Sequence, residues 1–303
     1  MIALLAPGQG SQTPGMLAEW LTLPGAADRV AAWSQISGLD LARLGTTATA
    51  EEITDTAVTQ PLVVATTLLA FDELNRRGLP SSSGDTLAAG HSVGEIAAYA
   101  IAGVIGADDA VRLAAVRGAE MAKACAAEPT GMSAVLGGDE DEVLTRLEAL
   151  ELVPANRNAA GQIVAAGSVA ALEKLAEDPP AKARVRPLAT AGAFHTQYMA
   201  AALDGYAAAA AEVRPEDPRI TLLSNADGQP VASGADAMEK LVAQLTRPVR
   251  WDLCSATLRQ RGTTAIVEFP PAGALTGIAK RELRGVATHA VKTPADLDGL
   301  VDL

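Results

Sequence analysis

Short apolar runs alternate with longer stretches of helical periodicity along this chain, an arrangement typical of an α/β fold. Apolar runs at 2–6 and 87–89 predict the first two strands. Stretches with few breaking residues predict helices at 26–36, 61–77 and 108–126. A Ser- and Gly-rich segment at 81–85 predicts a loop before the second strand.

The middle of the chain has a different order of elements. Four strands and two helices are predicted there in the order β-α-β-β-α-β, at 132–136, 140–150, 152–158, 162–166, 169–176 and 183–188. This order is that of a ferredoxin-like unit. We therefore predict that residues 129–191 form a small ferredoxin-like subdomain. It would be inserted into a large α/β-hydrolase-like subdomain with a parallel sheet, made of 1–128 and 192–303.

The pattern of the first part returns after the inserted unit. It predicts helices at 196–213, 235–245, 252–260 and 274–283, and strands at 220–223 and 265–269. Hydrophobic residues make up 49% of the chain but aromatic residues only 3%, which favours close-packed helices over an all-β sandwich.

Charge and targeting signals narrow the classes of function. The net charge of −12 argues against nucleic acid as a main ligand. The N-terminus lacks a basic region before its apolar run, and no apolar run reaches transmembrane length, so we expect a soluble cytoplasmic protein without a membrane partner. Cys125 and Cys254 lie far apart in helical patterns and are expected to be buried thiols.

The motif Gly90-His91-Ser92-Val93-Gly94 is the strongest chemical signal in the chain. It follows the predicted strand at 87–89 and precedes a helical stretch at 96–102. This context is typical of a nucleophile elbow, a tight strand-to-helix turn that holds a serine hydroxyl clear of the backbone. An ordinary Gly/Ser loop is the alternative, so the rest of the chain has to supply the supporting groups.

A serine nucleophile needs a base, and the chain has only three histidines. His91 lies within the motif, and His289 lies near the C-terminus in a predicted edge strand. His195 lies where the inserted unit ends and a helix begins, a junction where clefts are common, so we favour it as the base. No acidic residue has a local signature as a third member, which leaves a backbone carbonyl as the alternative partner of the base.

Two further segments could assist this chemistry. The Gly-rich turn at 7–12 lacks the spacing of a nucleotide-binding loop. It could instead offer the Gln9 N–H, beside that of Val93, as an oxyanion hole, although a simple tight turn is about as plausible. Arg117 lies on a mostly apolar helix, on the same face as Met121. Taken alone, this arginine is better interpreted as reaching solvent than as pairing with a buried carboxylate.

In combination, these pieces resemble the malonyl-CoA:acyl carrier protein transacylase family, which includes the acyltransferase domains of fatty acid and polyketide synthases. The matching pieces run in order along nearly the whole chain: 8–12, 90–95, Arg117 with Met121, 156–158 with Gln162, 194–195, 224–228, 248–251 and 268–280. Residues 269–273 depart from the Gly-Pro-Gly that the family often has, which leaves the shape of that loop open.

The resemblance implies a ping-pong acyl transfer. Ser92 would attack malonyl-CoA with His195 as base, and the malonyl group would then pass to the phosphopantetheine thiol of acyl carrier protein. In the family, main-chain carbonyls orient the histidine, and the matching segment here includes Gln244. Arg117 would bind the malonyl carboxylate in a bidentate pair, and an acetyl group would leave those donors unpaired.

The resemblance also implies the remaining parts of the site. Val93 and Phe194 match the malonyl-selecting type, in which a bulky Phe194 leaves little room for an α-methyl branch. The cleft is expected to be lined by Met121, Phe194, Asn158, Gln162 and His91. No cofactor is implied, because malonyl-CoA is a substrate. The carrier protein would dock on basic residues, for which the candidates are Lys182, Arg184, Arg186, Lys280, Arg281 and Arg284.

Two other classes of function remain open at this stage. A serine hydrolase would use the same Ser–His pair but would have no use for Arg117. A non-enzymatic acyl-binding module would not need Ser92, His195 and the Gly-rich turn together. Whether the pathway is fatty acid or polyketide synthesis is also open, and a monomer is the expected oligomeric state.

Overall fold

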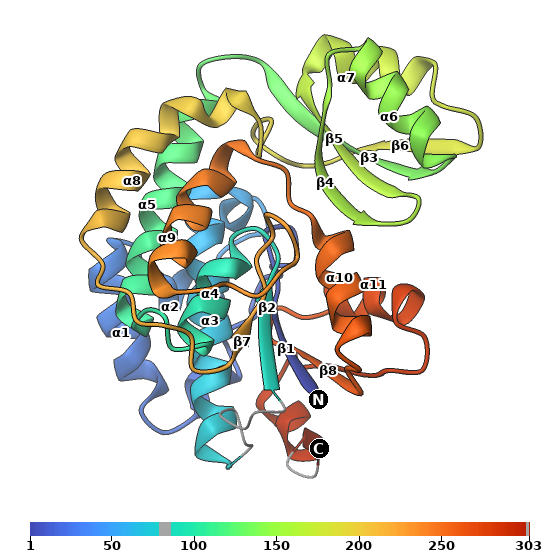
Figure 1. Ribbon diagram of the computed structural model, residues 1–303. Coiled ribbons are helices and arrows are strands. Elements are labelled where there is room, and N and C mark those ends of the chain that lie inside the picture. Colours follow the sequence, from blue (N-terminus) through green and yellow to red (C-terminus); the bar gives the residue numbers. More distant parts are fainter. Residues whose placement is uncertain (79–85, 301–302) are drawn as a thin grey trace.

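The computed structural model describes residues 1–78, 86–300 and 303, and within them two separate sheets (Figure 1). The loop predicted at 81–85 lies outside the described residues. Sheet A has the order β7-β2-β1-β8-β9, with every pair parallel. Its strands are β1 (Ile2–Ala6), β2 (Thr86–Gly90), β7 (Thr221–Leu222), β8 (Ala265–Glu268) and β9 (Ala287–Ala290).

Side chains of sheet A alternate between two apolar cores. Leu4 and Ala6 face the larger core, whereas Ala3 and Leu5 face the smaller one. Because successive side chains of a strand point to opposite faces, a strand that is covered on both faces is apolar throughout. This is why the predicted strands appear as continuous apolar runs rather than as alternating patterns.

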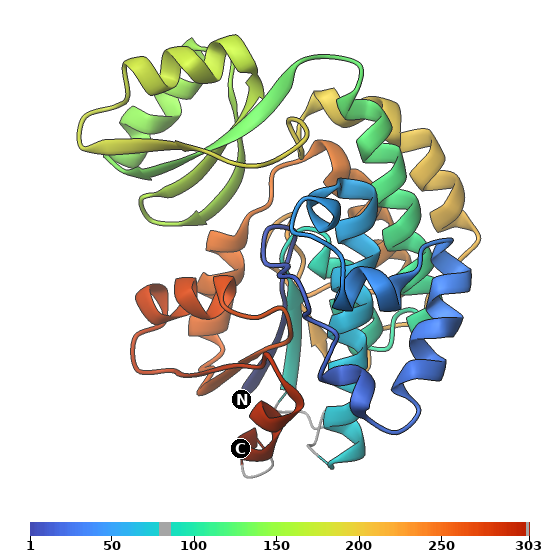
Figure 2. The same cartoon turned by 180° about the vertical axis from the view of Figure 1, so that it is seen from behind.

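Helices cover both faces of sheet A (Figures 1 and 2). The smaller core is covered by α10 (Trp251–Gln260) and α11 (Ala274–Glu282). The larger core is built with α1 (Ala26–Ser37), α2 (Leu41–Thr46), α3 (Thr56–Arg76), α4 (Gly94–Ile101), α5 (Ala107–Cys125), α8 (Leu203–Ala211) and α9 (Gly234–Ala243). Short 3-10 helices are η1 (Trp20–Thr22), η2 (Glu52–Thr54), η3 (Gln197–Ala202), η4 (Gln244–Thr246) and η5 (Pro294–Leu300).

Two helix predictions need correction, and one helix was missed. Helix α3 begins at Thr56 rather than at residue 61, because Asp55 caps the start at the N–H of Ala57, and Pro61 lies inside the helix. The single helix predicted at 196–213 is the 3-10 helix η3 followed by α8, since alanine-rich periodicity does not distinguish the two helix types. Helix α2 was not predicted from the sequence, and it is only one and a half turns long.

Helix α3 is long and apolar enough to cross a membrane, but 78% of its most apolar window is buried inside the protein. This burial identifies α3 as a core helix of the larger core. The thiol of Cys254 is also buried as expected, whereas Cys125 is only half-buried at the end of α5.

Sheet B is antiparallel, with the order β4-β5-β3-β6. It consists of β3 (Thr130–Gly137), β4 (Val153–Ala159), β5 (Gln162–Ser168) and β6 (Ala183–Pro187), with α6 (Glu140–Ala149) and α7 (Val169–Glu177). Its own apolar core includes Val135 and Leu147. The prediction of an α/β protein with a parallel sheet and a separate βαββαβ unit is thereby confirmed, while the subdomain boundaries at 129 and 191 stay a prediction.

Sheet B is joined to the rest of the molecule beside the end of β2. Backbone hydrogen bonds link Arg157 N to Val249 O (2.9 Å) and Val249 N to Ala155 O (2.8 Å), so β4 runs next to the segment that leads into α10. In register, Ala6 of β1 lies opposite Gly90 of β2. The carboxyl ends of these parallel strands therefore meet at one edge of sheet A, where ligands of open α/β sheets bind.

Candidate active site

Ser92 lies in the turn between β2 and α4 with a φ of 54°, a left-handed conformation that few residues other than glycine adopt. The flanking glycines make this turn possible. A Cβ on Gly90 would lie 2.0 Å from Gly94 O, and a Cβ on Gly94 would lie 2.3 Å from Ala6 O. The turn is fixed further by Asn225, whose Oδ1 accepts from Ser92 N at 2.8 Å. The motif thus forms the strand–turn–helix geometry of a nucleophile elbow.

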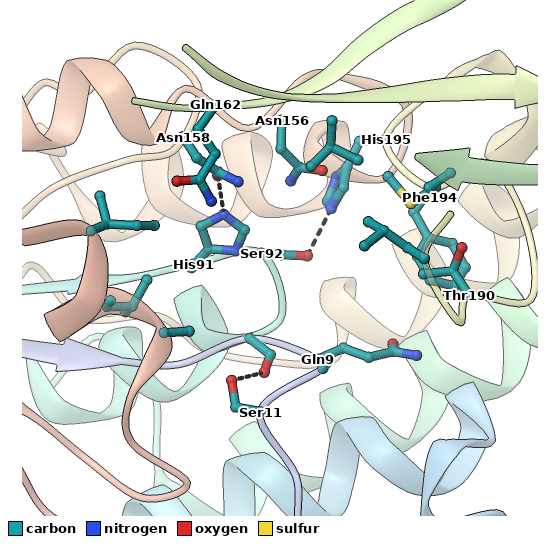
Figure 3. A pocket seen from close by; sticks show the side chains of 18 of the residues that line it. Gln9, Ser11, His91, Ser92, Asn156, Asn158, Gln162, Thr190, Phe194 and His195 are labelled. Atoms are coloured by element: carbon teal, nitrogen blue, oxygen red, sulfur yellow. Dashed lines mark hydrogen bonds between the residues drawn. The ribbon is translucent and has the colours of Figure 1, made fainter. Parts of the chain in front are cut away.

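The hydroxyl of Ser92 and the ring of His195 lie in direct contact (Figure 3). Ser92 Oγ is 2.7 Å from His195 Nε2, and His195 Nδ1 is 2.8 Å from the carbonyl oxygen of Gln244. A carbonyl can only accept, so Nδ1 carries the hydrogen and Nε2 presents its lone pair to the serine. His289 lies far from this contact in the edge strand β9.

The environment of His195 keeps its ring neutral. Burial, and next the positive charge of Arg117, lower the pKa of His195 to about 3. At neutral pH the imidazole is therefore unprotonated and able to accept the serine proton. The backbone carbonyl of Gln244 takes the orienting position that an acidic residue has in a Ser–His–Asp triad.

Arg117 is buried on α5 and directed at the same serine. Its Nη1 donates to Gln60 Oε1 and its Nη2 to Gln244 Oε1, both at 2.8 Å, and Nη2 lies 3.5 Å from Ser92 Oγ. The solvent-exposed interpretation that the helix pattern alone favoured is wrong. Only 1% of this residue is exposed, because α3 and η4 close over its guanidinium and supply amide oxygens.

The Gly-rich loop after β1 lies against the elbow. A Cβ on Gly8 would lie 2.7 Å from His91 O, so only glycine allows this approach. Within the described residues, neither the N–H of Gln9 nor that of Val93 has a hydrogen-bond partner. Both groups are thus free to donate to a ligand, and their role as an oxyanion hole stays a prediction.

A cavity of about 350 Å³ opens in front of Ser92. Most of the residues that the sequence suggested line it: Gln9, His91, Ser92, Arg117, Met121, Asn158, Gln162, Phe194 and His195. Val93 and Gln244 are not among the residues that line it. His91 Nε2 lies 2.8 Å from Asn158 Oδ1, and the side chain of Arg281 donates to that of Gln162 at the rim, so the cavity wall combines both sheets.

Other residues that line the cavity were not found from the sequence, among them Gln60, Met132, Leu188 and Thr190. Gln60 is the most informative of them, because a polar side chain in the apolar run of α3 is a signal that could have been noticed. Its Nε2 lies 3.5 Å from Met121 Sδ while its oxygen accepts from Arg117.

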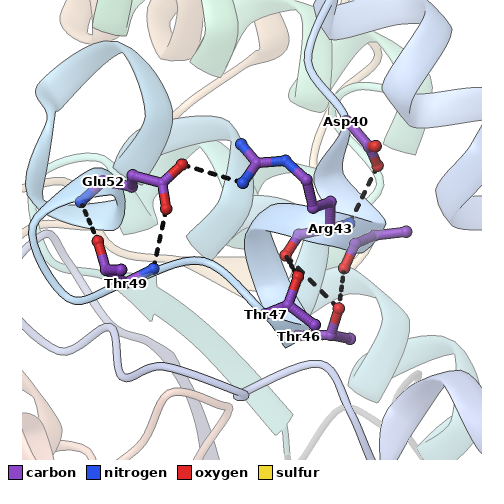
Figure 4. Close-up of polar contacts among 7 residues, drawn as sticks. Asp40, Arg43, Thr46, Thr47, Thr49 and Glu52 are labelled. Atoms are coloured by element: carbon purple, nitrogen blue, oxygen red, sulfur yellow. Dashed lines mark hydrogen bonds and ion pairs between the residues drawn. The ribbon is translucent and has the colours of Figure 1, made fainter.

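A capped segment before α3 fixes where Gln60 stands (Figure 4). Thr49 and Glu52 bond reciprocally, with Thr49 N donating to Glu52 Oε2 at 3.0 Å and Glu52 N donating to Thr49 Oγ1 at 3.3 Å. This is a capping box, and Arg43 adds a bond to the same carboxylate at 2.9 Å. These contacts set the path of the chain into α3, whose second turn carries Gln60.

The loop that departs from the family pattern is anchored by Glu268. This buried carboxylate at the end of β8 accepts from the N–H groups of Gly273 (3.0 Å), Leu275 (3.0 Å) and Thr276 (2.8 Å). An acidic side chain at a helix N-terminus satisfies the free N–H groups and complements the helix dipole. The double proline is thus compatible with a well-placed α11, which forms one side of the cavity.

Comparisons with known proteins agree with this geometry. The family model described as "Acyl transferase domain" matches residues 4–296. The malonyl CoA-acyl carrier protein transacylase of Mycobacterium tuberculosis is 75% identical over 303 residues, 100% of both chains. A crystal structure of MCAT from that organism has a TM-score of 0.97 at 75% identity, covering 99% of each chain.

A second similar solved structure contains a carrier protein bound to its transacylase. The malonyl-transacylase in complex with a type II PKS acyl-carrier protein has a TM-score of 0.93 at 30% identity, again covering 99% of each chain. Together with the full-length match to the family model, these similarities show that this chain belongs to the acyl transferase domain family.

Proposed function

We propose that this chain is an acyl carrier protein S-malonyltransferase, which moves a malonyl group from malonyl-CoA to the phosphopantetheine thiol of acyl carrier protein. The observation that carries the proposal is the meeting of three groups at one cavity. The Ser92–His195 pair can form an acyl-serine, and the buried cation of Arg117 lies 3.5 Å from the same hydroxyl. The relatives at 75% identity have this activity in their names.

The first half-reaction forms malonyl-Ser92. Ser92 Oγ attacks the thioester carbonyl while His195 Nε2 takes its proton, and the oxyanion receives hydrogen bonds from the N–H groups of Gln9 and Val93. Collapse of this intermediate breaks the C–S bond, and the imidazolium returns the proton to the departing CoA sulfur. The same steps in reverse, with the carrier's thiol as the attacking group, release Ser92.

Arg117 selects the acyl group. The malonyl carboxylate is one methylene away from the carbonyl under attack, so a cation beside Ser92 is within its reach. Each terminal nitrogen of Arg117 already donates once to a glutamine. Nη1 keeps one further N–H for a carboxylate oxygen, and the second N–H of Nη2 makes only a long 3.5 Å contact with Ser92 Oγ, which a carboxylate oxygen can replace. Phe194 lines the same cavity, and we expect it to disfavour an α-methyl branch.

Carrier docking completes the proposal. We expect the acidic carrier to approach the rim of the cavity, where Arg281 and Leu188 lie, and to contact the basic residues of α11 and β6. The enzyme would act as a cytoplasmic monomer in fatty acid or polyketide biosynthesis.

Brief mixing with malonyl-CoA followed by intact-protein mass tests the proposal. The expected result is a malonyl adduct that persists until a carrier thiol is added. An adduct that disappears in water alone would indicate a serine hydrolase instead. Binding of malonyl-CoA without any adduct would indicate a non-catalytic binding module.

A further inference from the structure

Glu95, which follows the elbow, is a buried carboxylate with no part in the reaction steps above. Only 1% of it is exposed, and each of its oxygens has a different partner. Oε1 accepts from Asn225 N at 2.6 Å, Oε2 accepts from Gln244 Nε2 at 2.6 Å, and the hydroxyl of Ser224 also bonds to the carboxylate. Distances this short are typical of hydrogen bonds to an ionised group.

Gln244 connects this carboxylate to both working parts of the site. Its side-chain oxygen accepts from Arg117 Nη2 at 2.8 Å, and its main-chain oxygen lies 2.8 Å from His195 Nδ1. One residue on η4 thus contacts the guanidinium with its side chain and the imidazole with its backbone. Any rotation of the Gln244 amide would break or lengthen its hydrogen bond with Arg117.

An amide has one donor end and one acceptor end, so its orientation matters. An ionised carboxylate can only accept, and Glu95 therefore holds the NH₂ end of Gln244 toward itself. At 2.6 Å this is the shortest contact of that NH₂ group, which also donates to Ser92 O and to Asn225 Oδ1, both at 3.3 Å. The oxygen end is then the one that faces Arg117. In the reversed orientation an NH₂ group would face the guanidinium, which has no acceptor, and both groups would lose a hydrogen bond while buried.

We infer that Glu95 is a positioning residue: by orienting the Gln244 amide, it holds the Arg117 guanidinium in place for the substrate carboxylate. The inference rests on the proposed function, because it concerns the malonyl-binding arm of that site. Malonyl transfer depends on this arm, whereas acetyl transfer needs only the Ser92–His195 pair. Glu95 therefore affects the preference for malonyl over acetyl more than it affects the chemical step.

The charge on Glu95 can change near neutral pH. Burial raises the pKa of Glu95 to about 7, against the opposing effects of the Asn225 N–H and of Arg117. Once protonated, the carboxyl group can donate its O–H to the Ser224 hydroxyl and is a weaker acceptor, so its hydrogen bond to the amide of Gln244 weakens. The malonyl-to-acetyl preference is thus expected to fall as the pH decreases through about 7.

The other ionisable groups around Glu95 do not change charge in this range. They lie on α4 itself and on α5, α8, α9 and α10: Tyr99, Arg117, Tyr206, Lys240 and Cys254. Burial raises the pKa of Tyr99, Tyr206 and Cys254. Burial lowers the pKa of Lys240, but its contacts with Asp236 and Asp227 together outweigh this effect and raise it, and Arg117 stays charged. Any titration of His195 affects both substrates alike and cancels in the ratio of their rates.

The test compares the acylation rates of wild type, Glu95→Gln and Glu73→Gln with malonyl-CoA and acetyl-CoA, followed by intact-protein mass. Glu73→Gln is the matched control, since Glu73 is also a buried carboxylate but is held by Arg76 and Arg77 at the far end of α3. In Glu95→Gln we expect the malonyl rate to fall about tenfold to a hundredfold, with the acetyl rate within a few-fold of wild type. The control should match wild type with both substrates.

The outcomes separate this inference from the proposed function. If wild type forms no malonyl adduct, the proposed function fails first. If Glu95→Gln loses both rates equally, Glu95 has only a structural role and the inference is wrong. A rise in the malonyl rate would also overturn it, because simple removal of a negative charge near Arg117 predicts that rise.

A second measurement needs no variant and stands even if Glu95→Gln does not fold. The malonyl-to-acetyl rate ratio of wild type is measured between about pH 6 and 8, on either side of the pKa of Glu95. The ratio should fall toward the acidic end, and in a folded Glu95→Gln variant it should be independent of pH. A flat ratio in wild type would overturn the inference.

Discussion

Replacing Arg117 by alanine tests the basis of substrate selection. Beyond the bonds to Gln60 and Gln244, a carboxylate can take one N–H from Nη1 and, in place of the 3.5 Å contact with Ser92 Oγ, one from Nη2. A hydrogen bond to a charged group contributes about 1.5–3 kcal/mol, so two of them contribute about 3–6 kcal/mol. That difference corresponds to a loss of roughly 10²- to 10⁴-fold in the rate of malonyl transfer. Acetyl transfer makes neither bond and should change much less.

The assay follows formation of the acyl-serine with malonyl-CoA and acetyl-CoA in parallel. The variant also leaves two buried glutamine oxygens without a donor, at a cost of about 1–3 kcal/mol each, so its folding must be checked by denaturant titration. Arg112→Ala is the matched control, because Arg112 lies on the same helix but pairs at the surface with Asp109 and Glu212. An equal loss for the two substrates in a folded Arg117→Ala variant would refute the reasoning.

Four further predictions concern three other site residues. Ser92→Ala should form no adduct with malonyl-CoA, and an adduct of unchanged mass would place the nucleophile elsewhere. His195→Ala should slow acylation without weakening CoA binding, and unchanged acylation kinetics would remove it as the base. The folded-state pKa of His195, about 3, lies below its ordinary value of 6.5. As the pH falls below about 6.5, His195 is protonated in the unfolded chain but not in the folded protein, so the free energy of unfolding decreases. The loss approaches about 5 kcal/mol near pH 3, and denaturation of His195→Gln at several pH values should show a shallower dependence. Phe194→Ala should raise methylmalonyl transfer relative to malonyl transfer about tenfold or more, the scale of one methyl group, and an unchanged ratio would exclude Phe194 as the selecting residue.

The local sequence determined most of the elements and the geometry of the elbow. Apolar runs at the strands reflect burial on both faces of sheet A, and the β-α-β-β-α-β order predicted the second sheet. Gly90 and Gly94 are needed because the backbone approaches them closely, within the turn and from the adjacent strand. The nucleophile elbow can therefore be recognised from a five-residue motif. These features depend on periodicity and turn chemistry, which act between near neighbours in the chain.

The partners of the buried polar groups were decided only by the tertiary structure. The helix pattern around Arg117 could not show that Gln60 and Gln244 would close over it, because those residues lie 57 and 127 positions away. Glu95 and Gln244 are likewise 149 positions apart in sequence. A buried charge is stable only where the fold brings complementary dipoles to it. Which polar groups surround a buried charge depends on how whole helices and strands pack together. No local stretch of sequence contains that information.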